Sequence, residues 1–296
     1  MEYNIIENKD TIIVKNIKDF IPKHIFECGQ CFRWDKQRDG SYTGVAFNRV
    51  INVKKEGNDV IFSNTNRRDF DDIWFNYFDL DRNYGEIKQE LAKDDILNKA
   101  IKHGQGIRIL NQDPWEILIS FIISANNRIP MIKKSIKILS KRYGEYIEEY
   151  KGEKYYSFPL ANVLDDLSIE EITNCGTGFR AKYILNASKI VSSNQTDIYK
   201  LKNLSTPDAR NQLMLFAGIG PKVSDCIMLF SMNKSDAFPI DIWVQRVMEY
   251  FYVDEGTKLM DIQKYAQEKF GNLAGFAQQY LFYYARELGI GRNKKR

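Results

Sequence analysis

A lysine, a cysteine and an aspartate are spaced so that they could carry out covalent chemistry on a carbon atom. Lys222 and Cys226 are four residues apart, which places both side chains on one face of a helix, and Asp241 follows nineteen residues after the lysine. A protonated lysine is no nucleophile, but a helix N-terminus and partial burial both favour the neutral amine. We therefore predict that Lys222 attacks carbon, with Cys226 as its neighbour and Asp241 as the acidic group.

The residues before the lysine form a short glycine turn that is suited to hold a phosphate. Gly218 and Gly220 can adopt backbone angles that a Cβ would penalise, and Pro221 suits the first position of the helix that follows. Free backbone N–H groups at the positive end of a helix bind phosphate oxygens. Asp241 comes after a proline, and we expect it to cap a second helix. The stretch therefore predicts a unit that grips a nucleic-acid backbone and reacts with it.

The elements that position these residues change in kind along the chain. Short segments rich in β-branched and aromatic residues predict antiparallel strands at residues 11–14, 31–34, 42–47, 50–53 and 60–62. Apolar residues then recur at helical spacing, and we expect helices at 114–124, 129–143, 169–174, 180–192, 206–216, 242–252, 260–270 and 274–288. This order indicates an α+β protein, with a small antiparallel sheet domain at residues 1–112 and a helical bundle at 113–296.

Composition limits the class of protein. The 296 residues include 43 Lys and Arg against 39 Asp and Glu, so a nucleic-acid surface has to be a local patch and not a global excess of charge. No apolar run approaches the ~18 residues of a membrane span, and we expect no membrane association. Cys28 and Cys31 form a lone CxxC pair without a second pair, and the only histidines in the sequence are His24 and His103, so we expect no metal site. The basic tail at 292–296 is expected to be solvated.

The glycine turn and the aspartate segment resemble a signature of DNA repair enzymes. GIGPK at 218–222 followed by PID at 239–241 resembles the helix-hairpin-helix and Gly/Pro…Asp signature of a superfamily of DNA glycosylases. A lysine at this spacing marks the bifunctional members, and the four-cysteine iron–sulfur loop of the endonuclease III branch is absent from this sequence. Segments that resemble 8-oxoguanine DNA glycosylase follow in the same order along most of the chain: 29–34 (GQCFRW), 111–114 (NQDP), 124–127 (SANN), 156–159 (YSFP), 178–181 (GFRA) and 275–278 (GFAQ).

This resemblance implies a pocket for a base that has left the duplex. The backbone carbonyl of Gly29 would accept a hydrogen bond from the ring N–H that oxidised guanine has and guanine lacks. Cys226 and Phe282 would sandwich the base, and Gln278 would bond its pairing edge. Gln278 and Phe282 are four residues apart, which puts them on one helix face. Such a pocket has to replace the stacking and pairing energy that the base loses on extrusion.

The resemblance also implies residues for the gap left in the duplex. Asn126 would fill the gap and Arg180 would bond the orphaned base, with Phe179 where the family usually has a tyrosine wedge. Met131 stands where eukaryotic members carry a second base-reading arginine, so we predict relaxed selectivity for the base opposite the lesion. Trp243 replaces the family's histidine near the 5′ phosphate, and either a phosphate contact or a packed aromatic side chain fits that position.

The activity implied by the resemblance is that of a bifunctional DNA glycosylase and abasic-site lyase. It would act on double-stranded DNA containing oxidised guanine without a cofactor, as a monomer in a bacterial cytoplasm, at the nucleoid. Two alternatives remain. One is a non-catalytic helix-hairpin-helix DNA-binding module, which the lysine, the aspartate and the base-pocket residues disfavour. The other is a glycosylase for alkylated bases or mismatched adenine, which would not need the lysine.

Overall fold

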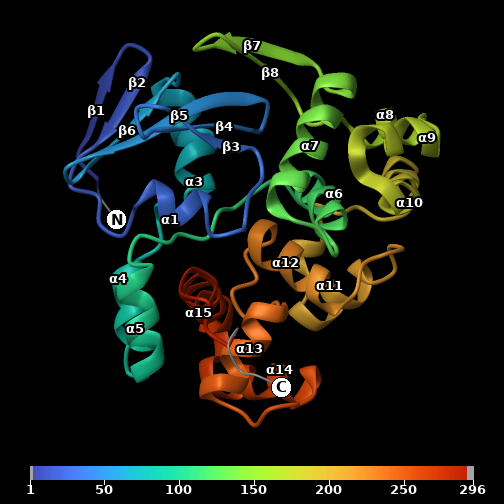
Figure 1. Cartoon of the computed structure of the whole chain (residues 1–296). Coiled ribbons are helices and arrows are strands. Elements are labelled where there is room, and N and C mark those ends of the chain that lie inside the picture. Colours follow the sequence, from blue (N-terminus) through green and yellow to red (C-terminus); the bar gives the residue numbers. More distant parts are fainter. Residues whose placement is uncertain (1–2, 292–296) are drawn as a thin grey trace.

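The computed structural model describes residues 3–291, and the basic tail at 292–296 lies outside the described residues. The N-terminal part is an antiparallel sheet and the rest of the chain is mainly helical (Figure 1). The predicted α+β class is confirmed. Among residues 3–291, no helix is both long enough and apolar enough to cross a bilayer.

Within the described residues, six strands form one antiparallel sheet in the order β1-β2-β6-β5-β4-β3. Hairpins join all neighbouring strands except β2 and β6, and in the β4–β5 loop Phe47 and Asn48 both have positive φ, as the right-handed twist of the flanking strands requires. The strands are β1 (Ile5–Asn8), β2 (Thr11–Val14), β3 (Trp34–Lys36), β4 (Tyr42–Ala46), β5 (Arg49–Glu56) and β6 (Asp59–Ser63). Strand β1 was not predicted from the sequence.

The strand predicted at 31–34 is wrong for most of its length, because β3 begins only at Trp34. Cys31 and Phe32 are buried, but in two different hydrophobic clusters, one under the sheet and one among the helices. Residues 31–33 therefore cross from one cluster to the other, although the Val45 N–H of β4 still donates to the Arg33 carbonyl at 3.3 Å. At the start of β3 the Trp34 ring covers Gly44, where an added Cβ would lie 2.2 Å from the ring.

The helices surround a second, larger hydrophobic cluster. Helix α6 is buried along almost its whole length and packs against α12, and α5 packs on α15. The longer helices are α4 (Tyr84–Leu91), α5 (Asp95–His103), α6 (Pro114–Ser124), α7 (Ile129–Tyr143), α10 (Ala181–Ser192), α11 (Thr206–Leu213), α12 (Pro221–Ser231), α13 (Ile242–Phe251), α14 (Leu259–Phe270) and α15 (Ala274–Leu288). Shorter helices are α1 (Pro22–Phe26), α2 (Arg67–Asp69), α3 (Phe75–Tyr77), α8 (Ala161–Asp165) and α9 (Ile169–Ile172).

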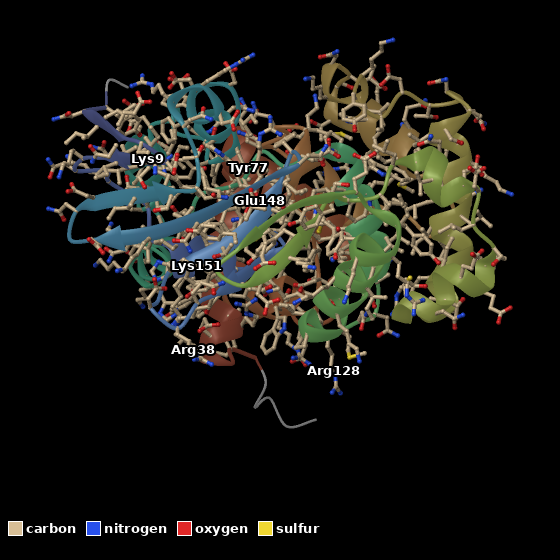
Figure 2. The ribbon with its side chains drawn as sticks, turned by 90° about the horizontal axis from the view of Figure 1, so that it is seen from above. Lys9, Arg38, Tyr77, Arg128, Glu148 and Lys151 are labelled. Carbon is tan, nitrogen blue, oxygen red and sulfur yellow. The ribbon has the colours of Figure 1, made fainter. Side chains whose placement is uncertain are left out.

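A β-hairpin interrupts the helical part and was missed by the sequence analysis. Strands β7 (Tyr146–Tyr150) and β8 (Glu153–Tyr156) pair around a turn at Lys151 and Gly152, both with positive φ. The hairpin reaches over to the sheet, where Asn64 Nδ2 donates to Glu148 Oε1 at 3.0 Å and Lys151 lies 3.6 Å from an Asp39 carboxylate oxygen (Figure 2). It therefore ties the two parts of the molecule together.

Candidate active site

The α11–α12 hairpin holds the glycine turn in a single conformation. Helix α11 ends at Leu213, and the Ile219 N–H donates to the Phe216 carbonyl at 3.1 Å. Gly218 has φ +84°, and a Cβ there would lie 2.7 Å from the Tyr183 ring, so only glycine fits. The predicted need for glycine is confirmed at this position.

Gly220 does not need glycine for its backbone angles, so that part of the prediction is wrong. It is the N-cap of α12 with φ −105° and ψ −177°, a conformation open to any residue. No atom lies within 4 Å of the Cβ that would be added there. No side chain caps the first turn of α12, and Pro221 occupies the first helical turn as predicted.

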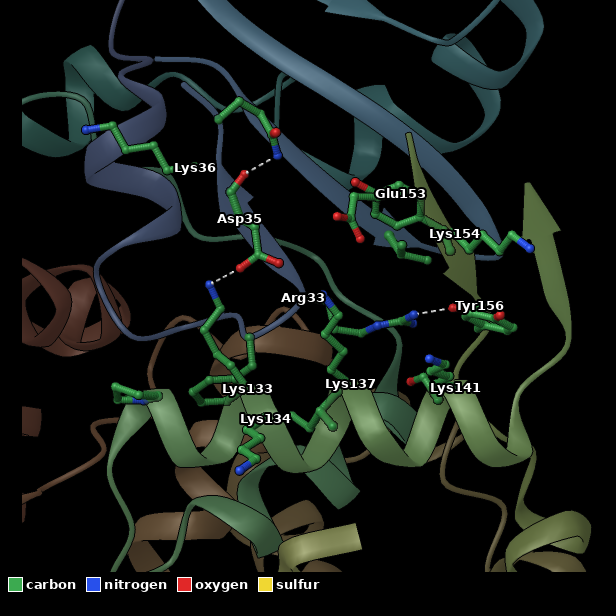
Figure 3. Close-up of a pocket in the computed structure, with 17 residues that line it drawn as sticks. Arg33, Asp35, Lys36, Lys133, Lys134, Lys137, Lys141, Glu153, Lys154 and Tyr156 are labelled. Carbon is green, nitrogen blue, oxygen red and sulfur yellow. Dashed lines mark hydrogen bonds and ion pairs between the residues drawn. The ribbon is translucent and has the colours of Figure 1, made fainter. Parts of the chain in front are cut away.

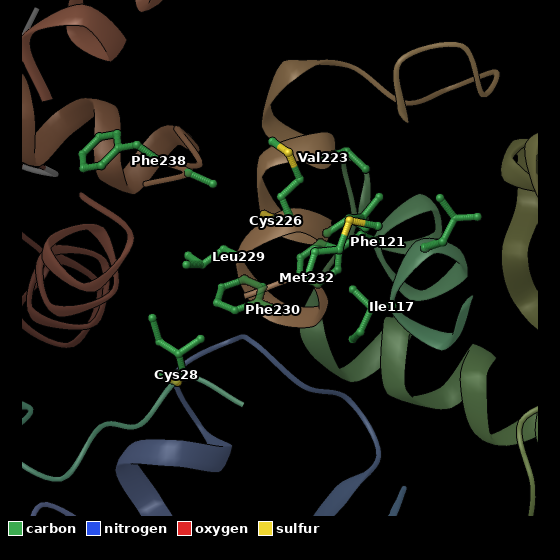
Figure 4. Packing of buried hydrophobic residues seen from close by; sticks show 14 of the residues in the cluster. Cys28, Ile117, Phe121, Val223, Cys226, Leu229, Phe230, Met232 and Phe238 are labelled. Carbon is green, nitrogen blue, oxygen red and sulfur yellow. The ribbon is translucent and has the colours of Figure 1, made fainter. Parts of the chain in front are cut away.

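Lys222 projects from the first turn of α12 toward α6. Its Nζ lies 5.3 Å from the centre of the Phe121 ring, and the side chain is half-buried. Figure 4 shows Cys226 on α12 and Phe121 on the neighbouring helix. Burial raises the pKa of the Cys226 thiol to about 11, although the charge of Lys222 opposes that increase. Cys226 is therefore a neutral thiol at neutral pH, and Lys222 stays the predicted nucleophile of the pair.

Asp241 caps helix α13, as the sequence predicted. Its Oδ1 accepts hydrogen bonds from the backbone N–H groups of Trp243 at 3.0 Å and Val244 at 2.8 Å. Burial raises the pKa of the Asp241 carboxyl, while those two N–H groups and the charges of Lys222 and Arg286 lower it. The two helix N-termini thus bring the candidate nucleophile and the candidate carboxylate into electrostatic contact.

Gly29 and Phe282 meet across 253 positions of the chain. Gly29 has φ +82°, and a Cβ there would lie 3.2 Å from Phe282 Cε1. Phe282 therefore rests directly on the backbone whose carbonyl was predicted to read the base. Gln278 lies on the same helix, is only 4% exposed, and its Oε1 has no hydrogen-bond partner in the structure. A buried acceptor without a partner is unusual, because its loss of contact with water is not compensated by a hydrogen bond. A ligand that donates to this oxygen would supply that hydrogen bond.

Arg286 lies beside Phe282 but was not among the site residues predicted from the sequence. It follows Phe282 by one helical turn, and its guanidinium carbon lies 5.2 Å from the centre of the Phe282 ring. One of its amino groups donates to the Glu27 carbonyl, whereas the other, Nη1, is buried without a partner. The spacing of Gln278, Phe282 and Arg286 at intervals of four on α15 was the available signal, because it places all three on one face.

The residues predicted to fill the gap in the duplex lie together, but Arg180 is engaged within the protein. The residue is 8% exposed; its Nε donates to the Ala125 carbonyl at 2.8 Å and its Nη2 donates to the Asn126 carbonyl at 3.0 Å. Arg180 thus holds the loop that carries Asn126, whose φ is +51°. Phe179 stacks against the guanidinium and is 59% exposed, and Met131 is 46% exposed.

Trp243 lies in the first turn of α13, directly beside Asp241. The side chain is half-buried, and the guanidinium carbon of Arg246 lies 5.4 Å from the centre of its ring. An indole that is half-open to solvent is compatible with either role proposed from the sequence.

As for metals, residues 3–291 contain no group of three or more His, Cys, Asp and Glu side chains that is arranged to hold an ion.

The fold and site define a class of protein: an antiparallel sheet followed by helices, with a lysine on a helix-hairpin-helix and a capping aspartate on the next helix. Comparison with known protein families supports this class for both parts of the chain. Residues 12–118 match the 8-oxoguanine DNA glycosylase N-terminal domain, and residues 119–294 match the HhH-GPD superfamily base excision DNA repair protein. The chain belongs to the HhH-GPD superfamily of base excision DNA repair glycosylases, and the resemblance found in the sequence is confirmed.

Two solved structures and one related protein sequence show which members of this superfamily the chain is similar to. The 8-oxoguanine glycosylase/lyase of Clostridium acetobutylicum, in complex with DNA, is 49% identical, with a TM-score of 0.96 over 98% of this chain and 100% of that one. MBOgg1 in complex with a low-affinity DNA ligand is 52% identical, with a TM-score of 0.95 over the same shares. A probable N-glycosylase/DNA lyase of Methanothermobacter thermautotrophicus is 31% identical over 218 residues, 67% of this chain and 69% of the relative.

Proposed function

We propose that this chain excises 8-oxoguanine from double-stranded DNA and then cuts the strand at the abasic site. The observation that carries the proposal is the placement of Lys222 and Asp241 at the N-termini of α12 and α13, where the charge of Lys222 lowers the pKa of the Asp241 carboxyl, next to a thiol that burial keeps neutral. The names of the structural relatives, an 8-oxoguanine glycosylase/lyase among them, support the choice of substrate.

The reaction begins with attack on the sugar. The amine of Lys222 attacks the anomeric carbon and gives up a proton, and the bond from that carbon to the base breaks, so the base leaves with the electron pair and takes up a proton. The Asp241 carboxylate stabilises the positive charge that develops on the sugar. Loss of the ring oxygen's bond then gives a Schiff base between Lys222 and the opened sugar. The negative carboxylate thus acts on a charge that exists mainly in the transition state.

Strand cleavage follows from the Schiff base. Its positive nitrogen acidifies the proton on the adjacent sugar carbon, and removal of that proton expels the 3′ phosphate as the carbon–oxygen bond breaks. Water then hydrolyses the Schiff base and returns Lys222 as an amine. Lys222 thus acts in two steps of the reaction, first as the nucleophile and then, as the Schiff-base nitrogen, as the electron sink for β-elimination.

Recognition of the base is assigned to Gly29, to Cys226 of α12 and to Gln278 and Phe282 of α15. The Gly29 carbonyl would accept from the ring N–H of 8-oxoguanine, and the unpartnered Oε1 of buried Gln278 would accept from the pairing edge. Guanine would place a lone pair against the Gly29 carbonyl, so discrimination exceeds the ~1 kcal/mol of one hydrogen bond. Because Phe282 rests on Gly29, the base has to displace that ring and then stack between it and Cys226.

Contacts with the rest of the duplex are also assigned. The turn at Gly218 and Gly220 would hold a phosphate, and Trp243 would donate to the phosphate 5′ to the lesion. Asn126 would fill the gap, and exposed Met131 would contact the opposite base without reading it. We therefore propose relaxed opposite-base selectivity, and action as a monomer at the bacterial nucleoid.

Borohydride trapping on a duplex with one 8-oxoguanine opposite cytosine tests the proposal, with the wild type beside Lys222→Gln. We expect a covalent adduct with the wild type alone, while the variant still binds the lesion duplex. A matched control is Lys234→Gln, which changes a lysine beyond the end of α12 and should leave trapping intact. An adduct with an abasic site but not with 8-oxoguanine would keep the lyase and discard the substrate. No adduct with either would favour a non-catalytic binding module.

A further inference from the structure

A cleft at the junction of the two parts of the molecule is separate from the residues assigned to the base. It lies between α7, strand β3 and strand β8 and encloses about 600 Å³. Figure 3 shows Lys133, Lys137 and Lys141 along the side of α7 that faces the two strands, with Lys36 and Lys154 on the strands. We call this space the lysine cleft.

Two cations at the base of the lysine cleft are neutralised and hold its walls together. The Lys133 ammonium donates to the Asp35 carboxylate at 2.7 Å and to the Trp34 carbonyl, which joins α7 to β3. Arg33 forms a salt bridge of 3.1 Å with Glu116 and also donates to a carbonyl of β8. These contacts hold α7, β3 and β8 in place. The other charged side chains of the cleft are therefore not needed to maintain its shape.

The other lysines of the lysine cleft are uncompensated. Each is exposed, and none forms a salt bridge with any residue among 3–291: these are Lys36, Lys134, Lys137, Lys141 and Lys154. The only lining carboxylate besides Asp35 is that of Glu153. The whole chain has a net charge of just +4, so this cleft concentrates positive charge that the rest of the surface lacks. Such a local concentration is the electrostatic mark of a polyanion site.

The geometry of the lysine cleft matches a nucleic-acid strand better than a small anion. Lys133 is held by Asp35, so the free part of the row on α7 is Lys137 and Lys141, about 6 Å apart along the helix. That spacing corresponds to about two nucleotides of one strand of duplex DNA. Pro130 lines the end of the cleft and is the direct neighbour of Met131, the residue assigned to the opposite base. A strand leaving that base therefore has a charged path to follow.

We propose that the lysine cleft binds the phosphate backbone of the strand opposite the lesion, within a few nucleotides of the orphaned base. The inference rests on the proposed function, because Met131 marks the position of that base. The free ammonium groups of Lys137 and Lys141 on the α7 wall neutralise neighbouring phosphates, which positions the flank of the duplex without reading its sequence. The lesion and the flank of its partner strand are then held by different parts of the fold.

The experiment measures the affinity of Lys137→Gln/Lys141→Gln for lesion duplexes across a range of salt concentrations. The two lysines contribute about 1.8 to the slope of log affinity against log salt, so the variant should show a shallower slope by that amount. The wild-type advantage should accordingly shrink about tenfold between 50 and 200 mM salt. The control is Lys99→Gln/Lys102→Gln, two exposed lysines of α5, which should bind like the wild type.

Three duplexes with one lesion strand locate the contact. The complement is either full length or recessed so that it ends about one nucleotide beyond the orphaned base, on its 5′ or its 3′ side. The difference between wild type and Lys137→Gln/Lys141→Gln should appear with the full complement and disappear on recession of one side only. A difference that survives both recessions, or no difference with the full complement, would overturn the proposal. Saturable binding of dGMP alone, lost in the variant, would instead assign the cleft to a free nucleotide.

The same samples separate this inference from the proposed function. Borohydride trapping depends on Lys222 and should be equal in the wild type and in both lysine-pair variants at saturating enzyme. Loss of trapping in the wild type would refute the assigned chemistry. Intact trapping with unchanged salt slopes would refute the lysine cleft alone.

Discussion

Asparagine in place of Asp241 removes a negative charge from the site and leaves helix α13 with its cap. Asp241 Oδ1 accepts from two backbone N–H groups, at 3.0 and 2.8 Å, and an asparagine side-chain oxygen can accept both. Asparagine and aspartate are about equally good N-caps, whereas alanine costs roughly 0.5–2 kcal/mol. The two substitutions therefore separate the charge of this residue from its structural role.

The charge should account for a large loss of activity. A carboxylate about 4 Å from a developing positive charge is worth about 4 kcal/mol at the effective dielectric of a partly buried site. Because ~1.4 kcal/mol corresponds to a tenfold change in rate, Asp241→Asn should slow base excision by about a thousandfold. Asp241→Ala should lose a similar factor, since it lacks the same charge.

Asp241→Asn should slow base excision, but it should not lower the stability of the protein. Burial raises the pKa of the Asp241 carboxyl, so the folded protein holds this proton more tightly than the unfolded chain does. The associated stability is present at low pH and is lost as pH rises through the raised pKa. At neutral pH the wild type therefore carries a desolvation cost that the neutral amide avoids. We expect the free energy of unfolding of the asparagine variant to equal or exceed that of the wild type.

Single-turnover excision at saturating enzyme and urea unfolding at pH 7 measure the two quantities on the same proteins. The reasoning fails if Asp241→Asn excises the base within tenfold of the wild-type rate. It also fails if the asparagine variant is destabilised as much as Asp241→Ala, because the residue would then act through more than its cap. A stable, slow variant would identify the carboxylate as a group retained for its charge.

Three further substitutions test other parts of the site. Met131→Arg should restore a base-reading donor and raise the preference for cytosine opposite the lesion by ~1–3 kcal/mol, measured as excision rates opposite all four bases; unchanged ratios would contradict this. Gly29→Ala, with φ +82° and a Cβ 3.2 Å from Phe282, should cost roughly 1–2 kcal/mol of unfolding free energy and slow excision far more than nicking of an abasic site. Buried Asp225 pairs with Arg210 at 2.8 Å, and burial raises its pKa to about 6. Its stability contribution is present at low pH and lost as pH rises from about 4 to about 6, so wild type minus Asp225→Asn unfolding free energies should fall across that window. A difference independent of pH would refute it.

Local signals in the sequence were enough to predict most of the helices. Helix α6 begins after Asp113, which caps it, and has Pro114 in its first turn, as predicted. Helix α7 covers residues 129–143 as expected, and Asp241 caps α13. Capping, proline placement and apolar periodicity act within a few residues, so they can be read without knowing the fold. The division into domains at residue 112 stays a prediction.

Segments whose structure depends on distant partners were harder to predict. Residues 31–33 have strand-like composition, but two buried side chains, Cys31 and Phe32, belong to different hydrophobic clusters. The β7–β8 hairpin stands in an otherwise helical region and contacts the sheet through Glu148 and Lys151, which no local pattern indicates. Strand formation depends on its pairing and packing context more than helix formation does.

The sequence alone determined the chemistry available to this protein: a lysine and a thiol on one helix face, a capping aspartate, and the motifs of a DNA glycosylase family. The tertiary structure decided how that chemistry is arranged. It alone places Phe282 on Gly29, brings the guanidinium of Arg286 next to that ring, and gathers lysines from α7 and two strands into one cleft. These contacts join residues that are far apart in the chain, and only packing brings them together.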